Sequence, residues 1–149
     1  MAKKILVPVD DVSAVEGVVP LIAAIARTTG ASVRLLHVLP VPGNVTSPEG
    51  RVVAYADQEM DRLEAAHATR LRSIAETHLP GLPVECIVRF GDPAEEILNE
   101  VSAFGADLVA VGTKTRSSLA RALLGSIAER IMRKSPATVV LVRSAPVSV

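Results

Sequence analysis

Short apolar runs alternate with longer amphipathic segments along the whole chain of 149 residues. The apolar runs contain mainly aliphatic and β-branched residues, which favour extended backbone. They predict five strands, at Ile5–Val9, Val33–Leu39, Pro83–Arg89, Asp107–Val111 and Ala137–Val142. The first, fourth and fifth runs are almost continuously apolar, as expected in a parallel sheet that is covered on both faces.

The segments between these strands carry apolar residues at helical spacing. They predict four helices, from about Ser13 to Gly30, over Val53–His78, from the Asp92 cap to Gly105, and over Ser126–Lys134. Pro20 lies inside the first segment and predicts a kink or a late start, because proline has no N–H for the helix ladder. The stretch 40–50 is rich in proline and glycine, which predicts a loop and makes it a candidate lid.

Alternating strands and helices in a chain of this length predict a single α/β domain over residues 1–149. Right-handed crossovers between parallel strands give a doubly wound sheet with helices on both faces. Such sheets bind ligands beyond the carboxyl ends of their strands, where the winding direction reverses. Asp10 and Gly112 follow the first and fourth strands, so they would face one crevice if those strands are neighbours.

The composition excludes several classes of partner. Sixteen basic and sixteen acidic residues cancel, and only 2% of residues are aromatic, so neither a basic nucleic-acid surface nor stacking platforms for bases are expected. The single cysteine fits a reducing compartment. No stretch approaches the roughly 20 apolar residues of a membrane span, and the first residues are too polar for a signal peptide. We therefore expect a cytoplasmic protein.

The segment 108–129 carries the clearest candidate for ligand chemistry. Its apolar strand leads to Gly112, a polar loop with Lys114–Ser118 follows, and Gly125–Ser126 begins the last helix. Glycine lets the backbone approach a ligand closely, and the free N–H groups of a helix N-terminus attract anions. The pattern therefore indicates a phosphate site.

Each part of this site also has a structural interpretation. Gly112 could simply terminate its strand. Ser126 could cap the last helix, since it has capping-box spacing with Glu129. Lys114, Arg116 and Arg121 could pair with phosphate or could be solvated surface residues; arginine is preferred for bidentate geometry.

Several segments together make the chain resemble the universal stress protein family over essentially its whole length. They are KKILVPVDD at 3–11, LLHVLP at 35–40, GDPAEEIL at 91–98, DLVAVGT at 107–113 and LLGSIAERIMRKSPATVVLV at 123–142. Nucleotide-binding members carry a glycine, two residues, a second glycine, nine residues and then Gly-Ser or Gly-Thr. Here Gly112 and Gly125–Ser126 match at that spacing, whereas Thr115 takes the place of the second glycine.

The resemblance implies an adenine-nucleotide alpha-hydrolase-like sheet with strand order 3-2-1-4-5, and ATP, with Mg²⁺ as a candidate companion, between the ends of the first and fourth strands. The implied ATP contacts are Pro8, Val9, Asp10 and Val38 at the adenosine end, and Gly112, Thr113, Lys114, Thr115, Arg116, Gly125, Ser126 and Ile127 around the phosphates. The implied role is a dimeric stress-response or regulatory protein with an unidentified protein partner. Because some members do not bind ATP, a nucleotide-free dimeric interaction module is the alternative.

Thr115 leaves the phosphate loop with two interpretations. A β-branched residue adopts a positive φ angle at a higher cost than glycine does, so the loop could take a different turn. Alternatively, the Thr115 hydroxyl could donate a hydrogen bond to a phosphate oxygen. The residues alone leave both open.

Asp10 is the candidate ligand residue at the end of the first strand. Its carboxylate could bind a ribose hydroxyl or an adenine amine, coordinate a metal, or cap the following helix, and its place at a switch point favours the ligand role. Together with Asp11 it also resembles the acidic pair that holds Mg²⁺ in response-regulator receivers. Receivers further need an Asp at the end of the third strand and a Lys at the end of the fifth, where this chain has Arg89 and Arg143, which disfavours that interpretation.

The sequence contains no recognisable combination of catalytic or metal-binding residues. His37 lies in a buried strand, where a single histidine is usually a core residue, and His67 and His78 lie eleven residues apart without a second ligand pair. Cys86, inside the third strand, is expected to be an inert buried thiol. We therefore expect a binding protein rather than an enzyme, with weak ATP hydrolysis left open.

In the strand order that the resemblance implies, the fifth strand is an edge. Its apolar run contains neither charge nor proline and consists of Thr138, Val139, Val140, Leu141 and Val142. Exposed edges of that kind invite pairing with another chain. We expect a twofold homodimer in which these strands pair antiparallel, the alternative being that the tail Ala145–Val149 folds back over the edge.

Overall fold

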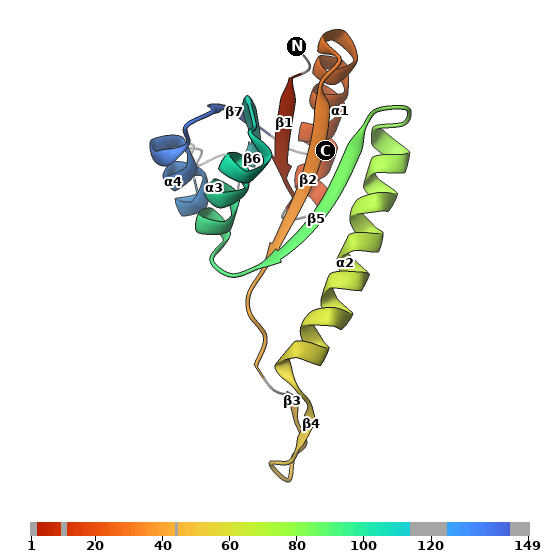
Figure 1. Ribbon diagram of the computed structural model, residues 1–149, viewed down its shortest axis with the longest axis vertical. Helices are drawn as coiled ribbons and strands as arrows, with labels where there is room; N and C mark the ends of the chain where they lie inside the picture. Colours follow the sequence, from red (N-terminus) through yellow and green to blue (C-terminus); the bar gives the residue numbers. More distant parts are fainter. Residues whose placement is uncertain (1–2, 10–11, 44, 114–124, 144–149) are drawn as a thin grey trace, which may run out of the picture.

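The computed structural model describes residues 3–9, 12–43, 45–113 and 125–143 (Figure 1). Its centre is a parallel sheet in the order β5-β2-β1-β6-β7. The strands are β1 (Lys4–Pro8), β2 (Ser32–Leu39), β5 (Val84–Phe90), β6 (Leu108–Thr113) and β7 (Thr138–Arg143). Counted along the chain, these five strands have the order 3-2-1-4-5, which confirms the predicted fold class.

Helices cover both faces of the sheet (Figure 1). They are α1 (Val12–Thr29), α2 (Ala56–His78), α3 (Pro93–Phe104) and α4 (Ser126–Lys134). α1 and α2 contribute side chains to one buried cluster, and α3 and α4 contribute to another on the opposite face. α1 and α2 lead to β2 and β5, in one half of the sheet, whereas α3 and α4 lead to β6 and β7, in the other half. Each pair of helices therefore covers one face, as a doubly wound topology requires.

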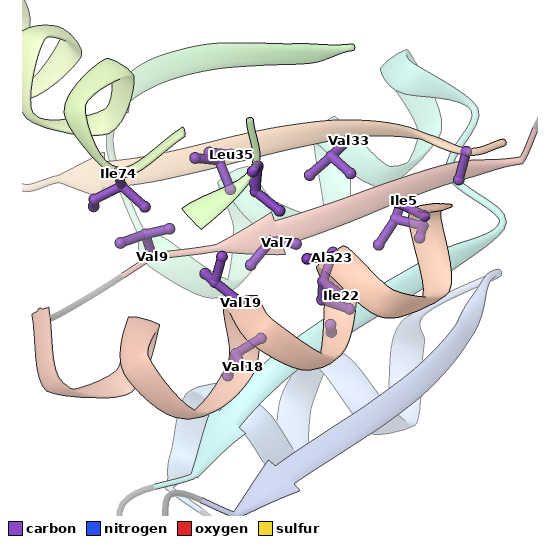
Figure 2. Close-up of a cluster of buried hydrophobic side chains, with 14 of the residues drawn as sticks. Ile5, Val7, Val9, Val18, Val19, Ile22, Ala23, Val33, Leu35 and Ile74 are labelled. Carbon is purple, nitrogen blue, oxygen red and sulfur yellow. The ribbon is translucent and has the colours of Figure 1, made fainter. Parts of the chain in front are cut away.

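β1 divides its side chains between the two cores, because successive side chains of a strand point to opposite faces. Ile5 and Val7 enter the cluster below α1 and α2, where Ile22 of α1 packs beside them (Figure 2). Leu6 enters the cluster on the α3 and α4 face. Burial on both faces explains why this strand has an almost unbroken apolar sequence.

The expected loop at 40–50 is not entirely irregular. Val45–Thr46 (β3) and Val52–Ala54 (β4) pair antiparallel and form a small hairpin that projects from the main sheet (Figure 1). The prediction that the second long helix begins at Val53 is therefore wrong by three residues. The β-branched residues of β4 favour extended backbone, and Tyr55 is still extended at φ −86° and ψ 157°.

The first helix also differs from expectation at its start. α1 begins at Val12, so Ser13 lies in its first turn and Pro20 does not delay the helix. Pro20 is exposed and lies inside the helix, where it removes only its own N–H donor. Packing of α1 against β1 through Val19 and Ile22 outweighs that loss.

Candidate functional site

The carboxyl ends of the central strands lie at one edge of the sheet. β1 pairs with β6 through Ile5 opposite Leu108, and with β2 through Pro8 opposite Leu36. The Val9 N–H donates to the Leu36 carbonyl at 2.7 Å, which holds the end of β1 beside β2. The expectation that the first and fourth strands are neighbours is confirmed, because β1 and β6 are hydrogen-bonded partners.

Three of the expected adenosine contacts lie at this edge. Pro8 ends β1 and is half-buried, and Val38 lies near the end of β2 and is also half-buried. The Val9 side chain is 5% exposed and points into the core beside Ile74, so only its backbone is available to a ligand (Figure 2). Asp10 lies outside the described residues, so its role stays a prediction.

The strand on the phosphate side is longer than predicted. β6 runs to Thr113, with Gly112 opposite Val142 and Thr113 opposite Arg143 of β7. Gly112 therefore lies inside a paired strand, and the interpretation that it ends the strand is wrong. The reason is that β7 continues alongside, with Val142 and Arg143 in register with these two residues.

Among the described residues, no side chain caps the N-terminus of α4. Gly125 is the N-cap residue at φ −56° and ψ 153°. Ser126 is already helical, so the interpretation that Ser126 caps α4 is wrong. The first helical hydrogen bond runs from the Glu129 N–H to the Gly125 carbonyl, and the amides of residues 126–128 have no acceptor within the helix.

The fold itself does not require a glycine at position 125. A Cβ atom placed there meets no atom of the described residues within 4 Å, and the φ angle is one that any residue adopts. Gly125, Ser126 and Ile127 are all exposed, the last at 38%. Such a position suits a backbone that a ligand approaches closely.

Contacts with α3 hold α4 at the same edge. Ile131 and Ala128 are buried in the core of that face. The Arg130 guanidinium donates to an Asp92 carboxylate oxygen at 3.1 Å, and the same oxygen accepts from the Glu95 N–H at 3.0 Å. Asp92 is the N-cap of α3 as predicted. This contact ties the middle of α4 to the start of α3, whose free amides are already capped by Asp92.

The rest of the expected phosphate loop, Lys114, Thr115, Arg116 and Arg121, lies outside the described residues, and its contacts remain predictions. Among the described residues, no group of three or more His, Cys, Asp and Glu side chains is placed to hold a metal ion. Within the same residues, no helix is long and apolar enough to cross a membrane.

A buried thiol is expected at Cys86, but the structure places this residue at the margin of the core. Its side chain is half-buried and lines a hollow of about 400 Å³ between the end of α2 and the start of β5, at the edge of the sheet opposite the candidate site. Burial raises the pKa of the Cys86 thiol, and nearby Arg72 opposes that shift. A raised pKa leaves less thiolate at neutral pH, which agrees with the expected low reactivity.

Sequence reasoning missed two polar groups in the structure. Glu100 is 1% exposed and binds Arg34 and Arg89. A charged residue within the apolar stripe of the third helix was the available signal. The His67 ring stacks on His37, and no local pattern could have predicted this contact because the two rings come from different elements.

A sequence model of the universal stress protein family matches residues 1–143. The chain therefore belongs to the universal stress protein family.

Individual relatives extend over the same length. A universal stress protein of Thermus aquaticus is 30% identical over 145 residues, which cover 96% of this chain and 100% of the relative. The solved structure of protein MJ0577 of Methanocaldococcus jannaschii has a TM-score of 0.77 at 26% identity, covering 98% of this chain and 99% of that one. A universal stress protein in complex with cAMP has a TM-score of 0.67 at 19% identity, covering 97% of this chain and 98% of that one, and shows the shared fold.

Proposed function

We propose that this protein binds ATP in the crevice between the carboxyl ends of β1 and β6, and that it acts as a dimeric stress-response or regulatory protein. The observation that carries the proposal is the N-terminus of α4, which follows β6 at this edge and which no side chain of the described part of the chain caps. Free amides and the positive end of the helix dipole suit a phosphate group. Membership of a family in which one protein was solved with cAMP supports a nucleotide as the ligand.

The two ends of the nucleotide would meet different surfaces. Pro8, Val9 and Val38 offer half-buried apolar surface and backbone groups to the adenosine, and Asp10 would accept a hydrogen bond from it. Gly125, Ser126 and Ile127 would hold phosphate, together with Gly112, Thr113 and the loop that follows. Mg²⁺ would accompany the phosphates, because it binds proteins mainly through phosphate oxygens, carboxylates and water. The role proposed here is binding rather than catalysis.

The test of the binding site is the replacement Gly125→Val. We expect at least a roughly tenfold loss of ATP affinity, because the valine side chain would occupy the approach of the phosphate, equivalent to about 1.4 kcal/mol. The fold should be intact, since no atom in residues 3–9, 12–43, 45–113 and 125–143 lies within 4 Å of the added Cβ atom. Calorimetry of ATP binding, with and without Mg²⁺, measures the effect. Ala24→Val is the control, because Ala24 is an exposed position in the middle of α1, away from the carboxyl ends of the strands.

The possible outcomes distinguish an ATP-binding protein from a nucleotide-free interaction module. Equal affinities for Gly125→Val and Ala24→Val would place the nucleotide elsewhere. No ATP binding by the unmutated protein would contradict the proposal and favour the nucleotide-free interaction module, to which the departure at Thr115 points.

We further propose that the dimer forms through β7. β7 is an edge of the five-stranded sheet, with Thr138 exposed and residues 139–142 half-buried. The outer side of an edge strand presents unpaired N–H and C=O groups, which an antiparallel copy of the same strand would satisfy by twofold symmetry.

Proline in β7 tests this assembly. Adjacent strand amides point in opposite directions, so one of Val139→Pro and Val140→Pro removes a bond to β6 and the other removes a bond across the dimer. We expect at least one variant to be a folded monomer at micromolar concentration in light scattering, while the unmutated protein is a dimer. A monomeric unmutated protein, or two dimeric variants, would contradict the proposed interface.

A further inference from the structure

β5 is the outermost strand of the five-stranded sheet, at the edge opposite β7 (Figure 1). All seven of its residues, Val84–Phe90, are in register with β2 on one side, and none of them is fully buried. On its other side, no strand of the described part of the chain pairs with it. An unpaired strand edge of this length is a surface that a second chain can extend.

Two hydrogen bonds show which backbone groups of β5 face outward. The Pro83 carbonyl accepts from the Val33 N–H at 2.9 Å, and the Gly91 N–H donates to the Leu39 carbonyl at 2.9 Å. Positions 83 and 91 therefore direct these groups to β2, and the odd positions between them do the same, because the direction alternates along a strand. The even positions direct their N–H and C=O groups away from the sheet, where an added strand could bind them.

A second copy of β5 matches this edge when the two strands lie antiparallel about Ile87. This register sets position 84 opposite 90 and 86 opposite 88, so that outward backbone groups meet outward groups. It also sets Glu85 opposite Arg89 of the second copy, twice by symmetry. These side chains are 57% and 43% exposed, although each already has one ion-pair partner in its own chain. Opposite charges in directly opposed positions stabilise a strand pair.

The other face of β5 is complementary in shape. Val84 and Cys86 line the hollow of about 400 Å³ beside the end of α2, together with residues 79–82. Val88 and Phe90 lie on this same face, because side chains alternate along the strand. In the register described above, Phe90 of the second copy lies opposite Val84, and Val88 of the second copy lies opposite Cys86. Their apolar side chains would fill the hollow, once on each side of the twofold axis.

We propose that β5 is an interface with a second copy of this chain, in which the two β5 strands pair antiparallel about Ile87. The charges select this register. Shifting the two strands to the next registers that keep outward groups together sets Glu85 opposite Ile87 or Gly91 rather than Arg89. Backbone, charge and shape therefore agree on one arrangement.

This interface is separate from the one proposed at β7, because the two strands are opposite edges of the sheet. A copy that used both edges would join two others, so assembly would continue beyond a dimer. A pair of short strands is smaller than a standard stable interface. We therefore expect β5 to pair at protein concentrations on the order of 500 μM, well above the micromolar range in which β7 is tested.

Cross-linking at about 500 μM tests the register. In a Cys86→Ser background, Ile87→Cys places two thiols on the twofold axis with ~4.5 Å between their Cα atoms, which suits a disulfide. Glu85→Cys in the same background is the matched control, because its copy lies four residues, roughly 13 Å, away along the strands. We expect oxidation to give on the order of tenfold more covalent dimer from Ile87→Cys. Equal yields, or no dimer from Ile87→Cys, would overturn the proposal.

The second test measures mass by light scattering and needs no cysteine. Ile87→Lys sets two like charges opposite each other at the twofold axis, while lysine at a strand edge can still reach water. From about 10 to about 500 μM, we expect the mean mass of the unmutated protein to rise roughly 1.5-fold or more, and that of Ile87→Lys to stay constant. Leu21→Lys, at a 43% exposed position on α1, is the matched control and should behave like the unmutated protein. No rise in the unmutated protein, or an equal rise in Ile87→Lys, would contradict the β5 interface whether or not β7 pairs.

Discussion

Replacement of Glu100 by alanine is expected to destabilise the protein by about 3–5 kcal/mol, the usual cost of removing one partner from a buried ion pair. Glu100 is 1% exposed, and its two carboxylate oxygens accept from Arg34 and Arg89 at 2.6 Å each. Arg34 also lies over the Phe104 ring, with 4.1 Å from its Cζ atom to the ring centroid. Without Glu100, the Arg34 side chain, which is only 17% exposed, would lose its buried partner and keep only the exposed Glu85.

Urea denaturation at pH 7 measures this loss. The control is Glu95→Ala, which removes an exposed carboxylate from the first turn of the same helix and should cost no more than about 1 kcal/mol. A loss below about 1 kcal/mol for Glu100→Ala would show that the buried pair does not stabilise the fold.

A double replacement separates charge from packing. Arg34→Leu combined with Glu100→Leu removes both buried charges and retains apolar volume, so we expect it to recover most of the loss caused by Glu100→Ala. Arg89 and Glu85 would remain, but these side chains are 43% and 57% exposed and can be hydrated. A double variant as unstable as Glu100→Ala would mean that the shape of the site, rather than the unpaired charge, sets the cost.

The sheet could be predicted from the sequence because its signals are local and consistent. β1, β6 and β7 are largely apolar runs, and Asp92, Pro93 and Gly105 mark the ends of α3 as their backbone preferences require. The order of the strands did not come from these signals. It came from the resemblance to a family, because strand pairing joins residues that are distant in the sequence.

The structure differs from the prediction at positions where tertiary contacts determine the local backbone conformation. β4 took the place of the first helical residues because it has a partner in β3, and Gly112 stayed within a strand because β7 extends beside it. The contact between His37 and His67 depends on how α2 crosses the sheet, which no periodicity encodes. The ends of β1 and β6 could be placed from the sequence, while Asp10 and the loop after Thr113 remain expectations.

Two isoleucines on α4 are expected to separate the structural and functional sides of that helix. Ile131 is fully buried against α3 and the sheet, whereas Ile127, one turn earlier, is 38% exposed at the open N-terminus. Ile131→Ala should destabilise the protein by about 2–5 kcal/mol, because it removes buried apolar surface and leaves a cavity. Ile127→Ala should cost less than about 1 kcal/mol, because less apolar surface returns to water.

ATP binding should respond in the opposite order. Ile127 is a proposed contact of the nucleotide, so Ile127→Ala should weaken ATP binding while the protein stays folded. Ile131→Ala, studied at a temperature where it is still folded, should bind ATP nearly as the unmutated protein does, because its side chain points into the core. Urea denaturation and calorimetry on the same two variants measure both effects. If Ile127→Ala lowered stability as much as Ile131→Ala, the N-terminus of α4 would be part of the core rather than an open site for phosphate.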